Sequence, residues 1–438
     1  MNTYKGKLGK EKAAHLLRRS TYVHHQRLID EYAELSSKEA VIRLFKFKPL
    51  RIKDPIDPKN NQPYVNMSRG KPFKLFRNNG SKSGRLNKYL VGWWMNEAHF
   101  DETIKSKLSF FLHTCFSIRY NQTDYISPHH LFDHFNLLYK YTDGSYKELA
   151  YEMVVDNTML EFLDNYTNAK DNPNENFARE YFELFTIGKG TQIEEGNYST
   201  FTEDDVRVAA RLLTGFVKGP INLDKRRINK NVTIKTDPCR GEANFQMHDL
   251  EDKSFSFAFQ NTTISAAKSE EEMWRELQDF VNMIFKQNKT AVYLAKRIYR
   301  FFVNSKIDSA AEKEVIQPLA SMLISNGYQL KPAIQELLQS EHFFSATASD
   351  TTEKNIGSKV KSPLELVMGT LTYFDVILPD ANLNAEECYE KWNVIGLIQD
   401  IYKSMGFNPF FHNEVLIQYA IERTDALMKY ASRVKEIY

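Results

Sequence analysis

The sequence predicts a mainly α-helical protein, a large multi-helix globule with a small inserted β-hairpin. Apolar residues recur at three- and four-residue spacing along most of the chain, which is the period of helices packed on one side. A two-residue alternation is confined to one stretch, in which Phe255, Phe257 and Phe259 alternate with Ser and Ala. At 438 residues the chain can bury a sizeable core, either as one compact unit or as two closely joined parts.

The N-terminal part, residues 1–50, is predicted to be helical. EKAAHLLRRS begins the helical pattern, and QRLIDEYAELSSKEAVIRLFKF continues it. Residues 51–85 lose this period and are rich in Pro, Asn, Gly and basic residues. That composition is typical of a long surface loop or a tether.

A central helical core is predicted over residues 86–220. Within it, LSFFLHTCF is apolar on nearly every side, as expected of a buried central helix. Residues 221–265 are predicted to hold the inserted β-hairpin, with its strands near residues 243–259. The C-terminal part, residues 266–438, is helical again apart from the polar stretch ATASDTTEKNIGSK.

Charge and cysteine content exclude several classes of protein. Lys and Arg number 58 against 56 Asp and Glu, so the net charge of +2 favours neither nucleic acid nor an anionic membrane as partner. Cys115, Cys239 and Cys388 are too scattered for a disulfide framework or a Cys-x-x-Cys zinc site. The N-terminus lacks an apolar signal region, and no run of about 18 apolar residues follows. We therefore expect no membrane insertion, and a cytoplasmic protein unless a signal-bearing partner carries it out.

One predicted helix, within DNPNENFAREYFELFTIGKG, combines many charges with many aromatic residues. It should begin near Pro173, with Asn172 or Asp171 capping the exposed amides. At about 100° per residue, the helix has an apolar face and a polar face. The apolar face holds Phe177, Ala178, Tyr181, Leu184, Phe185 and Gly188; the polar face holds Glu175, Asn176, Arg179, Glu180 and Glu183.

Spacing alone supports a simple interpretation of the polar face. Glu175, Arg179 and Glu183 follow one another at four-residue intervals, so they can form ion pairs along a solvated surface. The alternative is that these side chains turn inward and build a site.

A resemblance that extends along most of the chain favours a site. In order, AHLLRR, GWWM, KLSFFLHTCF, DNTMLEFLDN, NPNENFARE, YFELFTIGKG, FTEDDV, AARLLTGF, MHD and KSPLEL resemble the bacterial "domain of unknown function 1800" family. The family carries no established activity, so the resemblance marks candidate segments without naming a reaction.

The segment FTEDDV places Thr202 three residues before Asp205, a spacing typical of a capping box at a helix start. Gly215 suits a left-handed position at the end of the same helix. Arg211 either pairs with carboxylates of the NENFARE helix or points to solvent; the sequence leaves both open.

Histidines supply the remaining candidates. His113 lies in an apolar helix, where a lone histidine is more often a core residue than a ligand. His113 and Cys115 point about 200° apart on a regular helix, so they cannot share a metal ion. His248 and Asp249 either close the turn DLED or reach the acidic helix.

Two classes of function remain. The first is a hydrolase for a saccharide or an ester, whose catalytic candidates converge on one pocket. These candidates are Glu175, Arg179, Glu180, Glu183, Arg211, His113, His248 and Asp249. We expect Glu175, Arg179 and Glu183 to face inward, towards Arg211 or His248.

The second class is a non-catalytic partner, in which the polar cluster fixes helix order and the surface docks another protein. The resemblance suggests a sulfatase-like partner of the "domain of unknown function 1501" family. A third option is nucleic-acid binding through the basic stretch 51–85 and through Lys225, Arg226, Arg227 and Lys230. A solvated basic loop explains these residues more simply.

The sequence names no cofactor. Carboxylates at 175, 180 and 183 would suit Mg²⁺, Ca²⁺ or Mn²⁺. Arg179 would repel such an ion, so we predict no stoichiometric metal at this helix.

Overall fold

A computed structural model describes five long stretches of the chain: residues 1–47, 80–118, 126–219, 240–345 and 361–374. It also describes residues 56–57, 62–63, 72–74, 231–233, 359, 376, 384 and 387–388. Helices dominate these stretches, and the sheets are small and two-stranded, which confirms the predicted mainly α fold.

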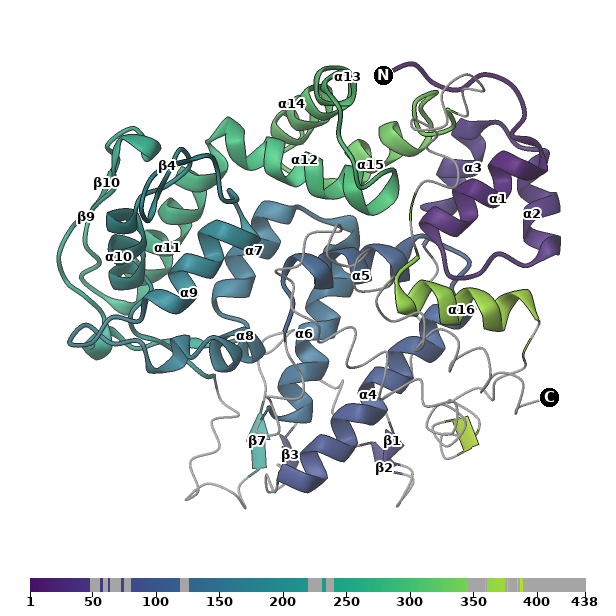
Figure 1. Ribbon diagram of the computed structural model, residues 1–438. Helices are drawn as coiled ribbons and strands as arrows, with labels where there is room; N and C mark the ends of the chain where they lie inside the picture. The colour runs from purple at the N-terminus through teal and green to yellow at the C-terminus, as the bar shows by residue number, and fades with distance from the viewer. Residues whose placement is uncertain are drawn as a thin grey trace.

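Three groups of helices follow one another along the chain (Figure 1). The N-terminal group consists of α1 (Gly9–Ser20), α2 (Gln26–Ala33) and α3 (Ser37–Leu44). The central group consists of α4 (Gly80–Phe100), α5 (Lys105–Cys115), α6 (Pro128–Lys140), α7 (Tyr146–Val154), α8 (Asn157–Phe162), α9 (Glu175–Glu180) and α10 (Glu203–Leu212). The C-terminal group consists of α11 (Glu270–Phe285), α12 (Asn288–Phe302), α13 (Ser309–Ala311), α14 (Gln317–Ser325), α15 (Leu330–Leu338) and α16 (Pro363–Tyr373).

Two α-helical stretches run on into π-helical turns. One turn, Tyr181–Phe185, follows α9, and the other, Glu312–Ile316, joins α13 to α14. Helix α4 begins at Gly80, inside the stretch predicted to be a loop, so that prediction was wrong at its C-terminal end. Of residues 51–79, only the short strands β1 (Ile56–Asp57), β2 (Gln62–Pro63) and β3 (Pro72–Lys74) are described.

The small sheets pair segments that are mostly close in sequence. The strands are β4 (Gln192–Glu194) with β5 (Asn197–Tyr198), β6 (Phe216–Val217) with β8 (Glu242–Ala243), β9 (Lys253–Ser254) with β10 (Thr263–Ile264), β1 with β2, and β3 with β7 (Asn231–Thr233).

The inserted hairpin exists, but its predicted strands were misplaced. The hairpin joins β9 to β10, whereas residues 242–243 pair with β6 instead. Phe257–Phe259 form a 3₁₀ turn, because the Ser256 hydroxyl accepts the amide of Ala258 and ends the strand. Phe255 and Phe259 are buried and Phe257 is exposed, so a turn produced the alternation that resembled a strand.

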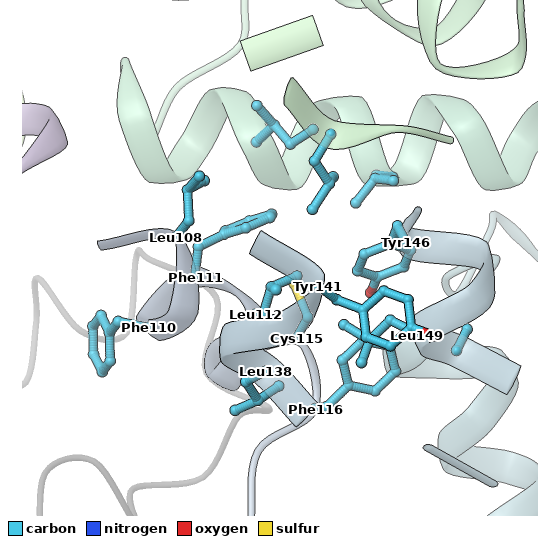
Figure 2. Packing of buried hydrophobic residues seen from close by; sticks show 14 of the residues in the cluster. Leu108, Phe110, Phe111, Leu112, Cys115, Phe116, Leu138, Tyr141, Tyr146 and Leu149 are labelled. Carbon is cyan, nitrogen blue, oxygen red and sulfur yellow. The ribbon is translucent and has the colours of Figure 1, made fainter. Parts of the chain in front are cut away.

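The core is one contiguous cluster of apolar side chains from every group of helices. Helix α5 lies within it, and Leu108, Leu112 and Cys115 have no exposed surface. Figure 2 shows Phe111 pointing towards the helix above it and Phe116 packed near Tyr146. The prediction that LSFFLHTCF is buried is therefore confirmed. No helix in the described ranges is both long and apolar enough to cross a membrane.

The helices at one end of the molecule carry the acidic segment. Figure 1 shows α9, α10 and α11 together at the end opposite α1 to α3, with α5 and α6 between the two ends. Helix α9 packs against α10, and α11 packs against α7.

Candidate functional site

The acidic helix α9 is short and starts two residues later than predicted. Asn174, rather than Asn172 or Asp171, caps it by accepting the amide of Asn176 at 3.0 Å. The helix continues directly into the π-helical turn Tyr181–Phe185. Single π-helical turns inside helices are frequent at functional sites.

The predicted apolar face of this helix is buried. Phe177, Tyr181 and Phe185 are at most 2% exposed, and the Tyr181 hydroxyl donates to the carbonyl of Ala150 on α7 at 3.1 Å. The Tyr181 ring also stacks on Phe280 of α11. This packing fixes which side of the helix turns to solvent.

Arg179 is the centre of an ion-pair network on the polar face. Its guanidinium donates to both carboxylate oxygens of Glu203, at 2.6 and 2.8 Å, and to Glu175 at 3.1 Å. The Glu175 pair is the predicted four-residue contact, whereas Glu203 comes from the start of α10. Two parallel hydrogen bonds to one carboxylate hold the guanidinium in a fixed plane.

Glu183 and Glu180 differ in their partners. Glu183 pairs with Lys189 at 3.1 Å, and the Lys189 ammonium also lies 4.7 Å from the centre of the Tyr198 ring. Glu180 is half-buried, and its Oε2 is a buried atom without a hydrogen-bond partner among the described residues. Burial, reinforced by the negative charge of Glu183, raises the pKa of Glu180 to about 7, although Lys189 and Arg179 oppose the shift.

The expectation that this face turns towards Arg211 or His248 was wrong. The side chains of Glu175, Arg179 and Glu183 are 41%, 33% and 15% exposed. Their described partners are Glu203, Arg207 and Lys189 rather than Arg211 or His248. The apolar face of α9 is the one packed inward, so its polar face looks along the surface to α10.

Arg211 pairs with the insertion and not with α9. Its guanidinium donates to both oxygens of Asp249 at 3.0 Å and to Glu251 at 2.8 Å. Burial alone would raise the pKa of Asp249, but Arg211, the Glu251 amide and Lys253 together lower it below its ordinary value. Asp249 also accepts the amide of Glu251 at 3.0 Å, so it closes the DLED turn.

His248 belongs to a closed network beneath this turn. Its Nδ1 donates to the carbonyl of Thr214 at 2.8 Å, and its Nε2 lies 3.0 Å from Glu276. The Lys253 ammonium lies 2.8 Å from the other oxygen of Glu276 and donates to the carbonyl of Asp249 at 2.6 Å. His248, Lys253 and Glu276 are at most 1% exposed, so these buried polar groups neutralise one another.

The predicted capping features are present. The Thr202 amide donates to Asp205 at 2.8 Å, and the Asp205 amide donates to the Thr202 hydroxyl at 3.2 Å. Asp205 also accepts the amide of Ser256 at 2.7 Å, which ties the insertion to α10. Gly215 has a φ of 79°, and a Cβ there would lie 2.6 Å from the carbonyl oxygen of Asn244.

His113 lies elsewhere, on α5, and is 7% exposed. Its ring is buried between Phe110 and Phe135 and lies 6.4 Å from the ring of His134 on α6. The candidates therefore separate into three places: the α9 face, the Arg211–His248 network, and the buried face between α5 and α6.

The third place holds residues that the sequence analysis did not select. His134 Nδ1 lies 3.0 Å from Asp156 Oδ1, and the same oxygen accepts the amide of Met159 at 2.9 Å as the N-cap of α8. His130 lies one helical turn before His134. The signal was available in PHHLFDH, in which three histidines and an aspartate fall within seven residues.

Arg297 of α12 contacts the surroundings of two of these places. Its guanidinium donates to the carbonyl of Leu184 in the π-helical turn at 2.8 Å and to the carbonyl of Thr114 in α5 at 2.6 Å. The acidic segment and the end of the His113 helix are thus held by one side chain.

No group of three or more His, Cys, Asp or Glu in the described stretches is arranged to hold a metal ion.

The architecture defines a class of mainly helical proteins whose polar motifs gather on α9, α10 and a small β insertion. The chain matches the family described as "Protein of unknown function (DUF1800)" over residues 15–416, and it belongs to that family. The resemblance read from the sequence is thereby confirmed. Comparison with curated proteins and with solved structures gave no match.

Proposed function

We propose that the protein is a hydrolase that acts on a polar saccharide or ester, with Glu180 as its general acid. One observation carries the proposal: in the acidic segment Glu180 retains a buried carboxylate oxygen without a partner among the described residues. Its neighbours Glu175, Arg179 and Glu183 all have ionic partners. A catalytic acid must be free to exchange its proton, whereas a structural carboxylate is held by its partners.

The environment of Glu180 suits proton donation near neutral pH. A pKa of about 7 leaves a substantial protonated fraction there, and a general acid is most effective when its pKa lies near the working pH. In the proposed step, Glu180 gives its proton to the leaving oxygen as the carbon–oxygen bond breaks. Water forms the new bond to carbon and releases one proton to the surrounding solvent.

The other candidates have supporting roles in this proposal. Arg179 fixes α9 to α10 through Glu203, and Lys189 keeps Glu183 oriented. Arg211, His248 and Asp249 anchor the insertion, and His113 lies on a separate face.

The test is hydrolysis by the full chain of a panel of 4-nitrophenyl glycosides and of 4-nitrophenyl acetate. Wild-type activity should decline above about pH 7, as Glu180 loses its proton. Glu180→Gln should lower the rate about 100-fold or more. Glu195→Gln, which changes an exposed acid on the neighbouring hairpin, is the matched control and should hydrolyse normally. Absence of hydrolysis across the panel, or an unchanged rate in Glu180→Gln, would refute the proposal.

A second candidate is a non-catalytic partner of a sulfatase-like "domain of unknown function 1501" protein. It is favoured by the paired state of the other charged candidates, since a purely structural network satisfies its members internally. Co-purification of a stoichiometric complex that Glu180→Gln leaves intact, together with a negative hydrolysis panel, would favour this function.

A further inference from the structure

Helices α6 and α8, which pack on each other, carry several hydrogen-bonding side chains that have no partner among the described residues. Both ring nitrogens of His130, Nε2 of His134 and the hydroxyl of Thr158 are buried and unpaired. His134 and Thr158 have no exposed surface, and His130 is 2% exposed. Because buried polar groups are nearly always hydrogen-bonded, such a group of exceptions points to something that binds there.

His134 is oriented by its neighbour. Asp156 Oδ1 can only accept, so the hydrogen on His134 Nδ1 points to it across 3.0 Å. Asp156 is itself held by the amide of Met159. The opposite nitrogen, Nε2, therefore presents a fixed acceptor for a donor on a bound molecule.

His130 and Thr158 complete a set of donors and acceptors. His130 is one turn from His134 on the same face of α6, and Thr158 follows Asp156 in the first turn of α8, which packs on α6. A neutral imidazole offers one donor and one acceptor, and a hydroxyl offers both. Neighbouring His113, His129 and Asp133 are buried as well but have interaction partners.

The surroundings favour an uncharged occupant. Burial, with lesser contributions from Lys218 and His129, lowers the pKa of His130 to about 3, so its ring is neutral at physiological pH. The Lys218 ammonium lies 3.5 Å from Glu161 and 4.1 Å from the centre of the Tyr166 ring, so its charge is balanced locally.

We propose that His130, His134 and Thr158 form a buried binding site for a small uncharged molecule with several hydroxyl groups, a polyol or a monosaccharide. Hydroxyl groups both donate and accept, and so can satisfy all four unpaired atoms. This inference is independent of the proposed hydrolysis at Glu180, which lies on another helix.

The unpaired nitrogens of His130 also affect the stability of the fold. An unsatisfied buried imidazole disfavours folding, and an apolar side chain of similar shape removes that penalty. Replacing His130 should therefore preserve the fold while removing the recognition group, a combination typical of functional residues.

The experiment is thermal unfolding of the full chain with glycerol, D-glucose and myo-inositol as probes. Concentrations stay in the low millimolar range, below those at which polyols stabilise proteins by exclusion. At least one probe should raise the melting temperature saturably in the wild type. The shift should disappear in His130→Leu and His134→Leu.

His15→Leu is the matched control, because His15 is also buried but its Nε2 contacts the carbonyl of Phe343 at 3.2 Å. Its probe-induced shift should equal that of the wild type. The proposal is overturned if the shift persists in His130→Leu and His134→Leu, or if His15→Leu abolishes it as well. It is also overturned if no probe shifts the wild type and crystals grown with each probe hold only water at these nitrogens. Hydrolysis by Glu180→Gln is a separate readout, so the two proposals fail independently.

Discussion

The acidic segment around α9 and the imidazole face between α6 and α8, formed by His130 and His134, differ in whether their polar groups have partners. Around α9, Arg179, Glu175 and Glu183 are paired, partly exposed and conspicuous in the sequence. Between α6 and α8, His130 and His134 are buried and leave nitrogens without partners. A dense run of charges can therefore be mainly scaffold, whereas unpaired neutral groups inside a core mark a place for a ligand.

The two regions also respond oppositely to pH. Glu180 has a higher pKa in the folded chain than its ordinary 4.5, so it disfavours folding as pH rises from about 4.5 to 7. His130 has a lower pKa in the folded chain than its ordinary 6.5, so it disfavours folding as pH falls from 6.5 towards 3. The effect of Glu180 is therefore separable above pH 6.5 and that of His130 below about pH 4.5, and the two overlap between these values.

The largest effect is expected in the buried ion-pair network of His248, Lys253 and Glu276. Glu276→Gln leaves the Lys253 ammonium and the His248 ring without their carboxylate, and should lower the free energy of unfolding by about 3–5 kcal/mol. Urea unfolding measures the change. Glu251→Gln, at the 81% exposed partner of Arg211, should cost less than about 1 kcal/mol. Similar costs for both variants would contradict the view that His248, Lys253 and Glu276 form a closed structural unit.

An effect of intermediate size is expected at the imidazole face, where a substitution should raise the free energy of unfolding instead of lowering it. Without ligand, His130→Leu should raise the free energy of unfolding by about 1–2 kcal/mol at neutral pH, because it removes unsatisfied buried nitrogens. The gain should grow by about 1 kcal/mol per pH unit below 6.5, where the wild type loses stability. Urea unfolding at neutral and acidic pH measures both. A variant less stable than the wild type would mean that these nitrogens have partners.

The smallest effect is expected at Glu180. Between about pH 5 and pH 8 the wild type should lose about 1 kcal/mol of stability, a value reduced for the solvent screening of a half-buried carboxylate. Glu180→Gln cannot ionise, so its unfolding free energy should fall less over this range. Parallel pH profiles for the two proteins would show that Glu180 titrates normally and would weaken its assignment as the acid.

The sequence predicted those features that depend on local spacing. The period of the α9 segment identified Phe177 and Tyr181 as buried, and the spacing in FTEDDV identified the Thr202–Asp205 cap. Gly215 was identified by the backbone conformation that a helix end requires. Each of these follows from a few neighbouring residues, so no tertiary information was needed.

Partners that are distant in sequence could not be predicted in this way. Arg211 was equally compatible with α9 or solvent, and its pairing with Asp249 depends on how the insertion folds over α10. The strand-like alternation at Phe255–Phe259 was overridden by the Ser256 turn. Asp156 has two roles, as helix cap and as partner of His134, and only the packing of α8 on α6 brings the second about.

The contacts of Arg297 bear on local unfolding at the π-helical turn and at the end of α5. The planar guanidinium donates to the carbonyls of Leu184 and Thr114 at the same time, and so links two helix ends. One guanidinium nitrogen donates to Leu184 and the other terminal nitrogen donates to Thr114, so a movement of either helix end displaces the side chain that holds both. We therefore expect the π-helical turn and the end of α5 to open together in local unfolding, although they are separated by about 70 positions along the chain.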